Sequence, residues 1–408
     1  MILGVFVAIA ILSAVRKDIT QGFDEVAHIS YVAQIQNTGN PWPALPTMRM
    51  LDPQNFHFTS EPNYLQHTPI FYALLAAIGP TLEGDPQAVL IYRFIDVGLV
   101  AVGLAALLGL GLAAGFSRYE FYAYAVPIVC IPVLAPVAGA VNNDNLAFLG
   151  GAVATLAVGQ LVATDCKTWL AVALAGAVAA GWAKLTGLVL TGAMVSAVVA
   201  YLLWGKRLRW TWTIAVALAF ALAALPYIIY ISQYGTPVPT TPAAISTSEI
   251  RDFGWTDPAH RSFLGYFVSF VGELVASWMP TLAARNSFHY AMLAIPVTTL
   301  VCAGVGIVLS LQRLWRRKER TIDVIIISGA LGLVVNFVLQ VNYSYHFYIA
   351  TGWMAGPYLR YYVPLAAIVP LACLSLLAAI ETPRWHAWLL GFLVAGPIIF
   401  RVFGAPLS

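Results

Sequence analysis

Long apolar runs recur along the whole sequence, and they constrain the fold more than any other feature. Stretches such as Val97 to Ala114 and Trp212 to Ile231 are apolar on every face. A helix crosses the hydrocarbon core of a bilayer with roughly 20 such residues, whereas a transmembrane barrel strand shows a short alternation of apolar and polar residues. Because a chain in lipid must satisfy its own backbone hydrogen bonds, these runs predict membrane-spanning α-helices.

The apolar runs predict about eleven spans, each near the length that a helix needs to cross a bilayer. With 60% hydrophobic and 10% charged residues, the composition excludes an ordinary soluble domain. No linker divides the chain, so we predict one all-α transmembrane bundle over residues 1–408. Three polar segments interrupt it, at 16–87, 232–289 and 341–360. The predicted spans are 1–15, 88–114, 121–140, 146–164, 168–183, 186–204, 211–231, 290–311, 322–340, 361–380 and 387–403.

The placement of charge predicts which side each segment faces. Alternation of the spans puts the three polar segments on one side and short basic turns on the other, and basic turns mark the cytoplasm. The polar segments carry most of the acidic residues and every histidine except His386, so we expect the chemistry on the outer face of a bacterial inner membrane. The basic turns contain Lys206, Arg207, Arg209, Arg313, Arg316, Arg317, Lys318 and Arg320.

Two short helices are predicted in the first outer segment, 16–87. Asp24 to Gln36 has an apolar side that includes Ile29 and Val32, and Asn37 to Pro41 ends it. Pro69 to Ile78 is apolar but too short to cross a membrane. Both should lie at the membrane interface and roof a cavity over the spans.

Asp24 and Glu25 follow the first predicted span, with His28 one helical turn further on. This spacing puts a carboxylate and an imidazole on one helix face. Adjacent carboxylates raise one another's pKa, and a positioned carboxylate can accept the proton of an attacking hydroxyl. The alternative is a solvated helix start, in which the acidic residues only favour the N-terminal dipole.

A second polar cluster, Asn142-Asn143-Asp144-Asn145, lies between two apolar spans on the same face. Asn and Asp are ordinary turn formers, yet Asp144 has little loop around it, and ionisable groups near spans face a cavity or a partner. Lys184 and Arg360 are cations on this side. Arginine binds phosphate oxygens bidentately, although each cation could instead extend to the lipid headgroups.

A metal site is the least supported of the candidates. His57, Glu61 and His67 are spaced loosely enough to ligate a divalent metal ion, but nothing in the sequence fixes them in one site. The sequence therefore implies no cofactor and assigns no metal ligand, and a divalent metal ion is kept only as the less favoured alternative. The modest net charge of +3 indicates no nucleic-acid partner.

Four sequence elements resemble the GT-C class of membrane glycosyltransferases, which includes protein O-mannosyltransferases and lipid A aminoarabinose transferases. The similarity is closest to a bacterial branch predicted to share that fold. It covers residues 1 to about 205, and beyond them only the last element and the run of spans. The elements are Phe23 to His28, His67 to Tyr72, Asn142 to Ala147, and Arg360-Tyr361-Tyr362-Val363-Pro364.

The resemblance implies transfer of a hexose or pentose from a polyprenyl-phosphate donor to a hydroxyl of a glycan, lipid or protein acceptor on the outer face. It implies Asp24 as the base, Glu25 beside it, and Arg360 near the donor phosphate. Such chemistry needs a base for the hydroxyl and a cation for the leaving phosphate. The spans would contact membrane lipids and hold the isoprenoid tail. The other substrate-binding residues expected are His28, His67, Asn143, Asp144, Lys184 and Tyr361.

The alternative function is a transporter or flippase of a lipid-linked or small polar substrate. Such a protein would show internal repeats, broken helices and ionisable groups at the middle of the membrane. The sequence has no visible repeat, and most of its charges gather near the ends of the spans. These features favour the transferase.

Overall fold

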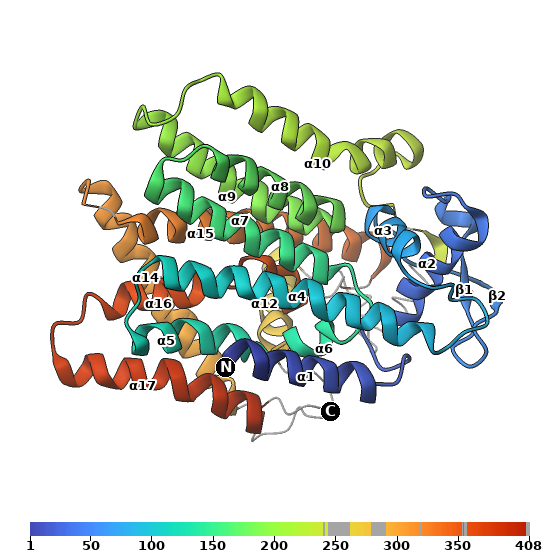
Figure 1. Cartoon of the computed structure of the whole chain (residues 1–408), viewed down its shortest axis with the longest axis horizontal. Coiled ribbons are helices and arrows are strands. Elements are labelled where there is room, and N and C mark those ends of the chain that lie inside the picture. The colour runs from blue at the N-terminus through green and yellow to red at the C-terminus, as the bar shows by residue number, and fades with distance from the viewer. Residues whose placement is uncertain are drawn as a thin grey trace.

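The computed structural model describes residues 1–239, 241–243, 262–278, 291–318, 320–352, 354 and 357–404. Its long helices run side by side in one bundle, and a short hairpin lies at one end (Figure 1). The first half comprises α1 (Ile2–Arg16), α2 (Glu25–Thr38), η1 (Leu45–Thr47), β1 (Arg49–Leu51), β2 (Phe58–Pro62), α3 (Ile70–Ile78), α4 (Ala88–Ala113), α5 (Arg118–Val129), α6 (Leu134–Ala138), α7 (Asp144–Thr164), α8 (Thr168–Ala183) and α9 (Leu185–Trp204). The second half comprises α10 (Trp212–Tyr234), α12 (Phe263–Ala276), α14 (Ala294–Trp315), α15 (Thr321–Thr351), η3 (Leu359–Leu365), α16 (Ile368–Leu377), α17 (Pro383–Ile399) and η4 (Phe400–Gly404).

The helical membrane fold predicted from the sequence is confirmed, but the number of spans is not. Within the described residues, seven helices are long and apolar enough to cross a membrane, or eight if the bent pair η3 and α16 forms one span. These seven are α4, α7, α9, α10, α14, α15 and the last helix, α17 with η4. Helices α1, α8 and α12 are apolar but have only 10–17 residues. The expected eleven crossings are therefore not confirmed.

Prolines explain two of the differences from the predicted spans. The predicted span 121–140 is two pieces, α5 and α6, because Pro127 lies inside α5 and Pro132 lies in the break. The predicted span 361–380 is η3 and α16, which meet at 64°, and Pro364 lies inside η3. A proline lacks the N–H that a continuous helix requires and bends or interrupts it.

The predicted polar segments also differ in part. Helix α15 continues to Thr351, so most of 341–360 is helical rather than a loop. Its 31 residues exceed the roughly 20 that a hydrocarbon core requires. Helix α12 lies against the far part of α15, where Tyr266 and Ser344 share a hydrogen bond. The rest of 232–289, apart from 232–239, 241–243 and 262–278, lies outside the described residues.

The first polar segment, 16–87, folds as a cap over one end of the bundle, at the right of Figure 1. The expected short helices are present as α2 and α3, and strands β1 and β2 pair antiparallel, with Leu51 opposite Phe58. Gly39 ends α2 with a left-handed backbone, as the Asn37 to Pro41 signal predicts. Helix α2 is buried on nearly every side, including Ile29 and Val32. The cap therefore has a core of its own.

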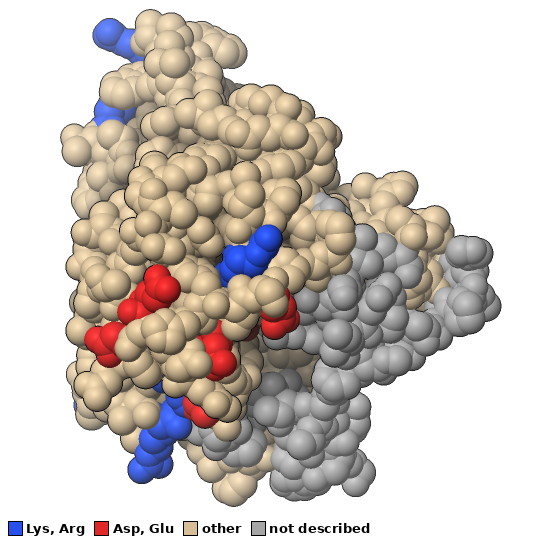
Figure 2. Space-filling model, turned by 90° about the vertical axis from the view of Figure 1, so that its right-hand side faces the viewer, with Lys and Arg blue, Asp and Glu red and all other residues tan. Residues whose placement is uncertain are grey.

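Chain direction brings several helix termini together under this cap. Helix α7 begins at Asp144, α8 ends at Ala183 and α9 begins at Leu185, so these three ends meet there. The basic turns after α9 and α14 lie at the opposite end of the bundle (Figure 1). Acidic side chains gather beside basic ones on the capped end (Figure 2).

A close backbone contact sets the position of η3. A Cβ atom at Gly151 of α7 would lie 2.2 Å from the carbonyl oxygen of Pro364, so only glycine permits this approach. The Leu359 N–H donates to Ser277 Oγ at 3.0 Å, which ties the start of η3 to α12. These two contacts hold Arg360 over the first turn of α7.

Candidate active site

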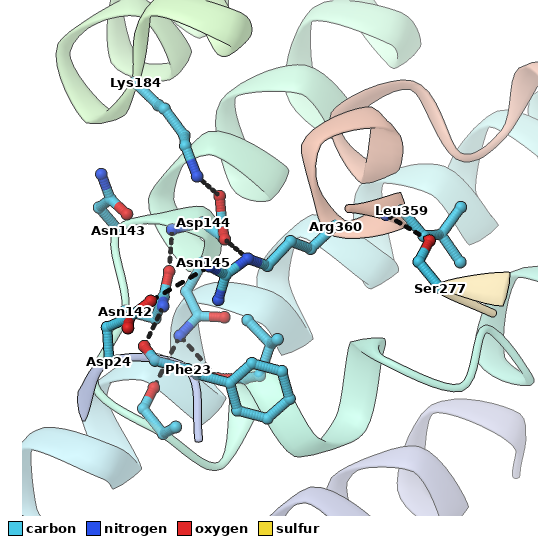
Figure 3. A network of polar contacts seen from close by, with 12 residues as sticks. Phe23, Asp24, Asn142, Asn143, Asp144, Asn145, Lys184, Ser277, Leu359 and Arg360 are labelled. Carbon is cyan, nitrogen blue, oxygen red and sulfur yellow. Dashed lines mark hydrogen bonds and ion pairs between the residues drawn. The ribbon is translucent and has the colours of Figure 1, made fainter. Parts of the chain in front are cut away.

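A chain of four charged side chains joins four separate parts of the sequence under the cap (Figure 3). Lys184 Nζ donates to Asp144 Oδ1 at 2.8 Å. The Arg360 guanidinium reaches both acidic residues, with Nε 3.5 Å from Asp144 Oδ2 and Nη2 donating to Asp24 Oδ2 at 3.2 Å. The sequence singled out all four residues, and the structure brings them into one network.

Asp24 is held at the N-terminus of α2 by an unusual backbone. Both Phe23 and Asp24 have φ of 60°, a left-handed conformation that side chains other than glycine rarely adopt. Strain of this kind persists only where the surroundings enforce it, and it is concentrated at functional sites. Tyr64 donates to Asp24 Oδ1 at 3.0 Å, so one carboxylate oxygen faces a phenol and the other faces Arg360. The side chain of Asp24 keeps 21% of its surface exposed.

Arg360 retains hydrogen-bonding capacity although it is largely buried. Its Nε and the nearby Asp144 Oδ2 form an ion pair but no hydrogen bond to any described residue. The guanidinium carbon lies 5.5 Å from the centre of the Tyr361 ring and 5.1 Å from that of Tyr358. Aromatic faces hold the cation in place without using its N–H donors. Those donors suit the oxygens of a phosphate.

Glu25 has a different environment from its neighbour Asp24. Both of its oxygens accept from Arg93, from Nε at 2.7 Å and from Nη2 at 2.8 Å, and Oε1 also accepts from the Val141 N–H at 2.9 Å. Arg93 Nη1 donates to the carbonyls of Ala14 and Lys17, which end α1. The expectation of a shared acid/base pair is thus not reflected in the contacts. Glu25 joins α2 to α1 and α4.

His28 lies behind Asp24 and is fully buried. Asn142 donates from Nδ2 to the Phe23 carbonyl at 2.9 Å and accepts from the Asp144 N–H at 2.8 Å, so its amide orientation is determined. The same Nδ2 lies 3.2 Å from His28 Nε2, which must therefore be the acceptor. His28 Nδ1 then donates to the Tyr72 hydroxyl at 2.8 Å. The imidazole is neutral and positions the residues around Asp24.

The remaining expected residues surround the same network. The His67 ring stacks on His28 with their centres 5.9 Å apart. Tyr361 lies beneath Lys184, whose Nζ is 3.9 Å from the ring centre. Asn143 Nδ2 donates to the Ala183 carbonyl at 2.8 Å and so ties the start of α7 to the end of α8. His67, Tyr361 and Lys184 thus lie beside the charged network, whereas Asn143 holds two helix ends together.

Burial governs the protonation of this region. It lowers the pKa of His67 to about 3, with the Lys184 ammonium adding to the effect, and it holds the pKa of His28 well below its usual value. Burial also lowers the pKa of Lys184 to about 8, although Asp144 opposes the shift. At neutral pH the site therefore contains neutral imidazoles and a charged lysine.

Sequence reasoning missed several residues of the site. Arg93 and Asp96 lie three residues apart in an apolar span, and an ionisable pair in a span was a signal for function. Asp96 Oδ2 accepts from the Asn142 N–H at 2.9 Å. Tyr64 carried no such signal, because nothing in its surroundings distinguishes it from other tyrosines.

Metal ligation has no geometric support in the described part of the chain. Within those residues, no group of three or more His, Cys, Asp or Glu side chains is arranged to hold a metal ion. His57 and Glu61 are exposed in the hairpin region, while His67 stacks on His28. The three residues considered from the sequence are therefore not gathered in one cluster.

Comparisons with known proteins give limited results. No family model and no curated protein matches the sequence. Among solved structures, the chain is similar to ArnT from Cupriavidus metallidurans bound to undecaprenyl phosphate, with 15% identity, a TM-score of 0.47, and coverage of 95% of this chain and 62% of that chain. It is also similar to the apo state of that protein, with 18% identity, a TM-score of 0.42, and coverage of 95% and 61%. The chain thus spans about three fifths of the length of these structures, and they identify no family for it.

Proposed function

We propose that this protein is a membrane glycosyltransferase that transfers a sugar from a polyprenyl-phosphate donor to an acceptor hydroxyl on the outer face of the membrane. The observation that carries the proposal is the Asp24–Arg360–Asp144–Lys184 network. It puts a partly exposed carboxylate beside two cations, at the end of the bundle opposite the basic turns. A base and a phosphate-binding cation are the two groups that this reaction requires.

The proposed step uses these residues directly. The acceptor oxygen attacks the anomeric carbon of the sugar while Asp24 takes the hydroxyl proton. The bond between that carbon and the phosphate oxygen breaks, and the bonding electrons leave with the polyprenyl phosphate. Arg360 and Lys184 stabilise the charge that develops on the phosphate. The phosphate would compete with the carboxylates for the N–H groups of Arg360, which frees Asp24 to act as the base.

Glu25, His28 and Asn143 act through position in this proposal. Glu25 is saturated by Arg93 and Val141, and His28 is held between Asn142 and Tyr72. Neutral His67 and the Tyr361 ring lie near Lys184. We assign both residues to substrate binding. The His67 imidazole offers one donor and one acceptor to sugar hydroxyls.

The transporter alternative receives less support. The ion pairs of the described residues lie at the two ends of the bundle: those under the cap, and Arg207–Asp165, Arg313–Asp323 and Arg320–Asp323 at the other end. A substrate pathway would instead place ionisable groups near the middle of the membrane. This distribution favours chemistry at one face.

The test is transfer by purified protein from a panel of polyprenyl-phosphate sugars. Asp24→Asn is nearly isosteric and should lower turnover by about a hundredfold to ten-thousandfold, the range for loss of a general base, while donor binding persists. Asp18→Asn is the matched control, because Asp18 is exposed and, among the described residues, its carboxylate accepts hydrogen bonds only from Thr20. Near-native transfer by folded Asp24→Asn would remove the base assignment. Movement of lipid-linked sugar across vesicles without transfer would favour the flippase.

A further inference from the structure

One cation under the cap takes part in none of the ion pairs that the described residues form there. Among the described residues, Glu25 pairs with Arg93, Asp144 pairs with Lys184, and Asp24 pairs with Arg360. A fourth cation, Lys17, ends α1 in the same region, and no ion pair is formed by it within the described residues.

The ammonium of Lys17 is buried without an acceptor. Its Nζ is shielded from solvent and makes no hydrogen bond to any described residue. The nearest acidic residue in the sequence, Asp18, forms no ion pair with Lys17, and its Oδ1 accepts from the Thr20 N–H at 2.8 Å and from the Thr20 hydroxyl at 2.7 Å. Burial lowers the pKa of Lys17 only to about 8, so it is charged at neutral pH. A buried charge without a partner is costly.

Lys17 faces the reacting end of the site. Its Nζ lies 4.1 Å from the centre of the Phe23 ring, and the Arg360 guanidinium lies 5.9 Å from the same centre. The charges of Glu25, Arg93, Arg360 and Asp24 all act on the Lys17 ammonium, Glu25 most strongly. The left-handed backbone at Phe23 and Asp24 therefore presents one aromatic ring to two cations.

We propose that Lys17 is a phosphate-binding residue, which together with Arg360 holds an anionic group of a substrate beside Asp24. The inference rests on the proposed function and deepens it, because it adds to the Asp24–Arg360–Asp144–Lys184 network a residue that forms none of those ion pairs. A phosphate would supply the acceptor oxygens that the ammonium lacks among the described residues. The phosphate belongs either to the polyprenyl carrier or to a second, anionic substrate.

Binding of undecaprenyl phosphate by the full-length, detergent-purified protein tests the carrier as the source. Lys17→Met keeps the aliphatic stem over Phe23 and removes the charge, so affinity should fall about tenfold to a hundredfold, as expected for one charge-assisted hydrogen bond. Affinity for uncharged undecaprenol should not change, and Lys17→Arg should restore most of the loss. Arg16→Gln is the matched control, because Arg16 is the exposed neighbouring cation.

A second measurement tests the other source. Protein saturated with undecaprenyl phosphate is titrated with a short-chain phosphatidic acid, whose binding should be lost in Lys17→Met if the anion is a second substrate. Either loss supports the inference. If both ligands bind Lys17→Met as they bind the wild type, or if Arg16→Gln has the same effect, the inference is overturned. If the wild type binds phosphatidic acid through Lys17 but does not bind undecaprenyl phosphate, the anion site at Lys17 is supported and the proposed polyprenyl-phosphate donor is refuted.

Discussion

Exchanging Glu25 for glutamine isolates the structural role that its contacts indicate. The Glu25 carboxylate is fully buried and Arg93 is 7% exposed. Glutamine can keep its oxygen at the Oε1 position, where the Val141 and Arg93 Nε donors remain satisfied. Its NH2 group would then face Arg93 Nη2, which lies 2.8 Å from the present oxygen, so two donors would oppose each other and the arginine would lose its counter-ion.

Breaking a buried ion pair by removing one partner lowers the free energy of unfolding by about 3 to 5 kcal/mol. Because two of the three hydrogen bonds to Glu25 survive in Glu25→Gln, we expect a loss at the lower end of that range, about 3 kcal/mol. Denaturant titration of detergent-purified protein measures it, with exposed Glu83→Gln as the control. Arg93→Met added to Glu25→Gln should recover part of the loss, because it removes the unpaired charge. Folded Glu25→Gln should retain near-native turnover. Wild-type stability, or lost turnover without lost stability, would refute this reasoning.

Three further outcomes are expected from the site and its sidedness. Arg360→Lys keeps the charge but loses the planar fork, so affinity for the polyprenyl-phosphate donor should fall by about 1 to 3 kcal/mol in a binding titration, and unchanged affinity would exclude phosphate contact. Lys184 and Lys17 each have a pKa of about 8, so both are charged below pH 8 and lose their charge as the pH rises through that value. Affinity for the donor should therefore fall above pH 8. It should fall less in the Lys17→Arg/Lys184→Arg double variant, because arginine stays charged. Neutral His28 and His67 should add no inflection between about pH 5 and 7, where a histidine ordinarily titrates. An impermeant maleimide should label Glu61→Cys in intact cells, whereas native Cys166, exposed in the turn at the opposite end, should react only after permeabilisation; the reverse pattern would invert the site's orientation.

Charged residues made much of the site predictable from the sequence. In a chain with 10% charged residues, Asp24, Asp144, Lys184 and Arg360 stand out because each lies beside an apolar run, where an unpaired charge is costly. Their pairing was not predictable. Asp24 and Arg360 are 336 positions apart, and no local pattern relates them. Adjacency in the sequence predicts that Asp24 and Glu25 act together as an acid/base pair. In the structure, Glu25 instead binds Arg93 on α4.

The helices were predictable where apolar runs are uninterrupted and less so where prolines or polar residues intervene. Span 211–231 matches α10 closely, because its apolar run is continuous. The predicted span 121–140 is not one continuous helix, since Pro132 lies in the break between α5 and α6. Segment 341–351 contains several polar residues, which predict a loop. In the structure it is the continuation of helix α15. Tyrosine and serine hydroxyls on that helix instead meet partners such as Tyr266.

The separation of Asp24 and Arg360 in the sequence also means that the charge network can be completed only late in translation. A ribosome adds about 5 to 20 residues per second, so the 336 positions between them correspond to roughly 20 to 70 s of translation. During that interval Asp24 and then Asp144 have been made, whereas Arg360, the cation that they share, has not. A chain that stops before η3 has most of its helices but no complete charge network. Of the four residues in the network, Arg360 is made last, so the network is complete only once η3 has been made.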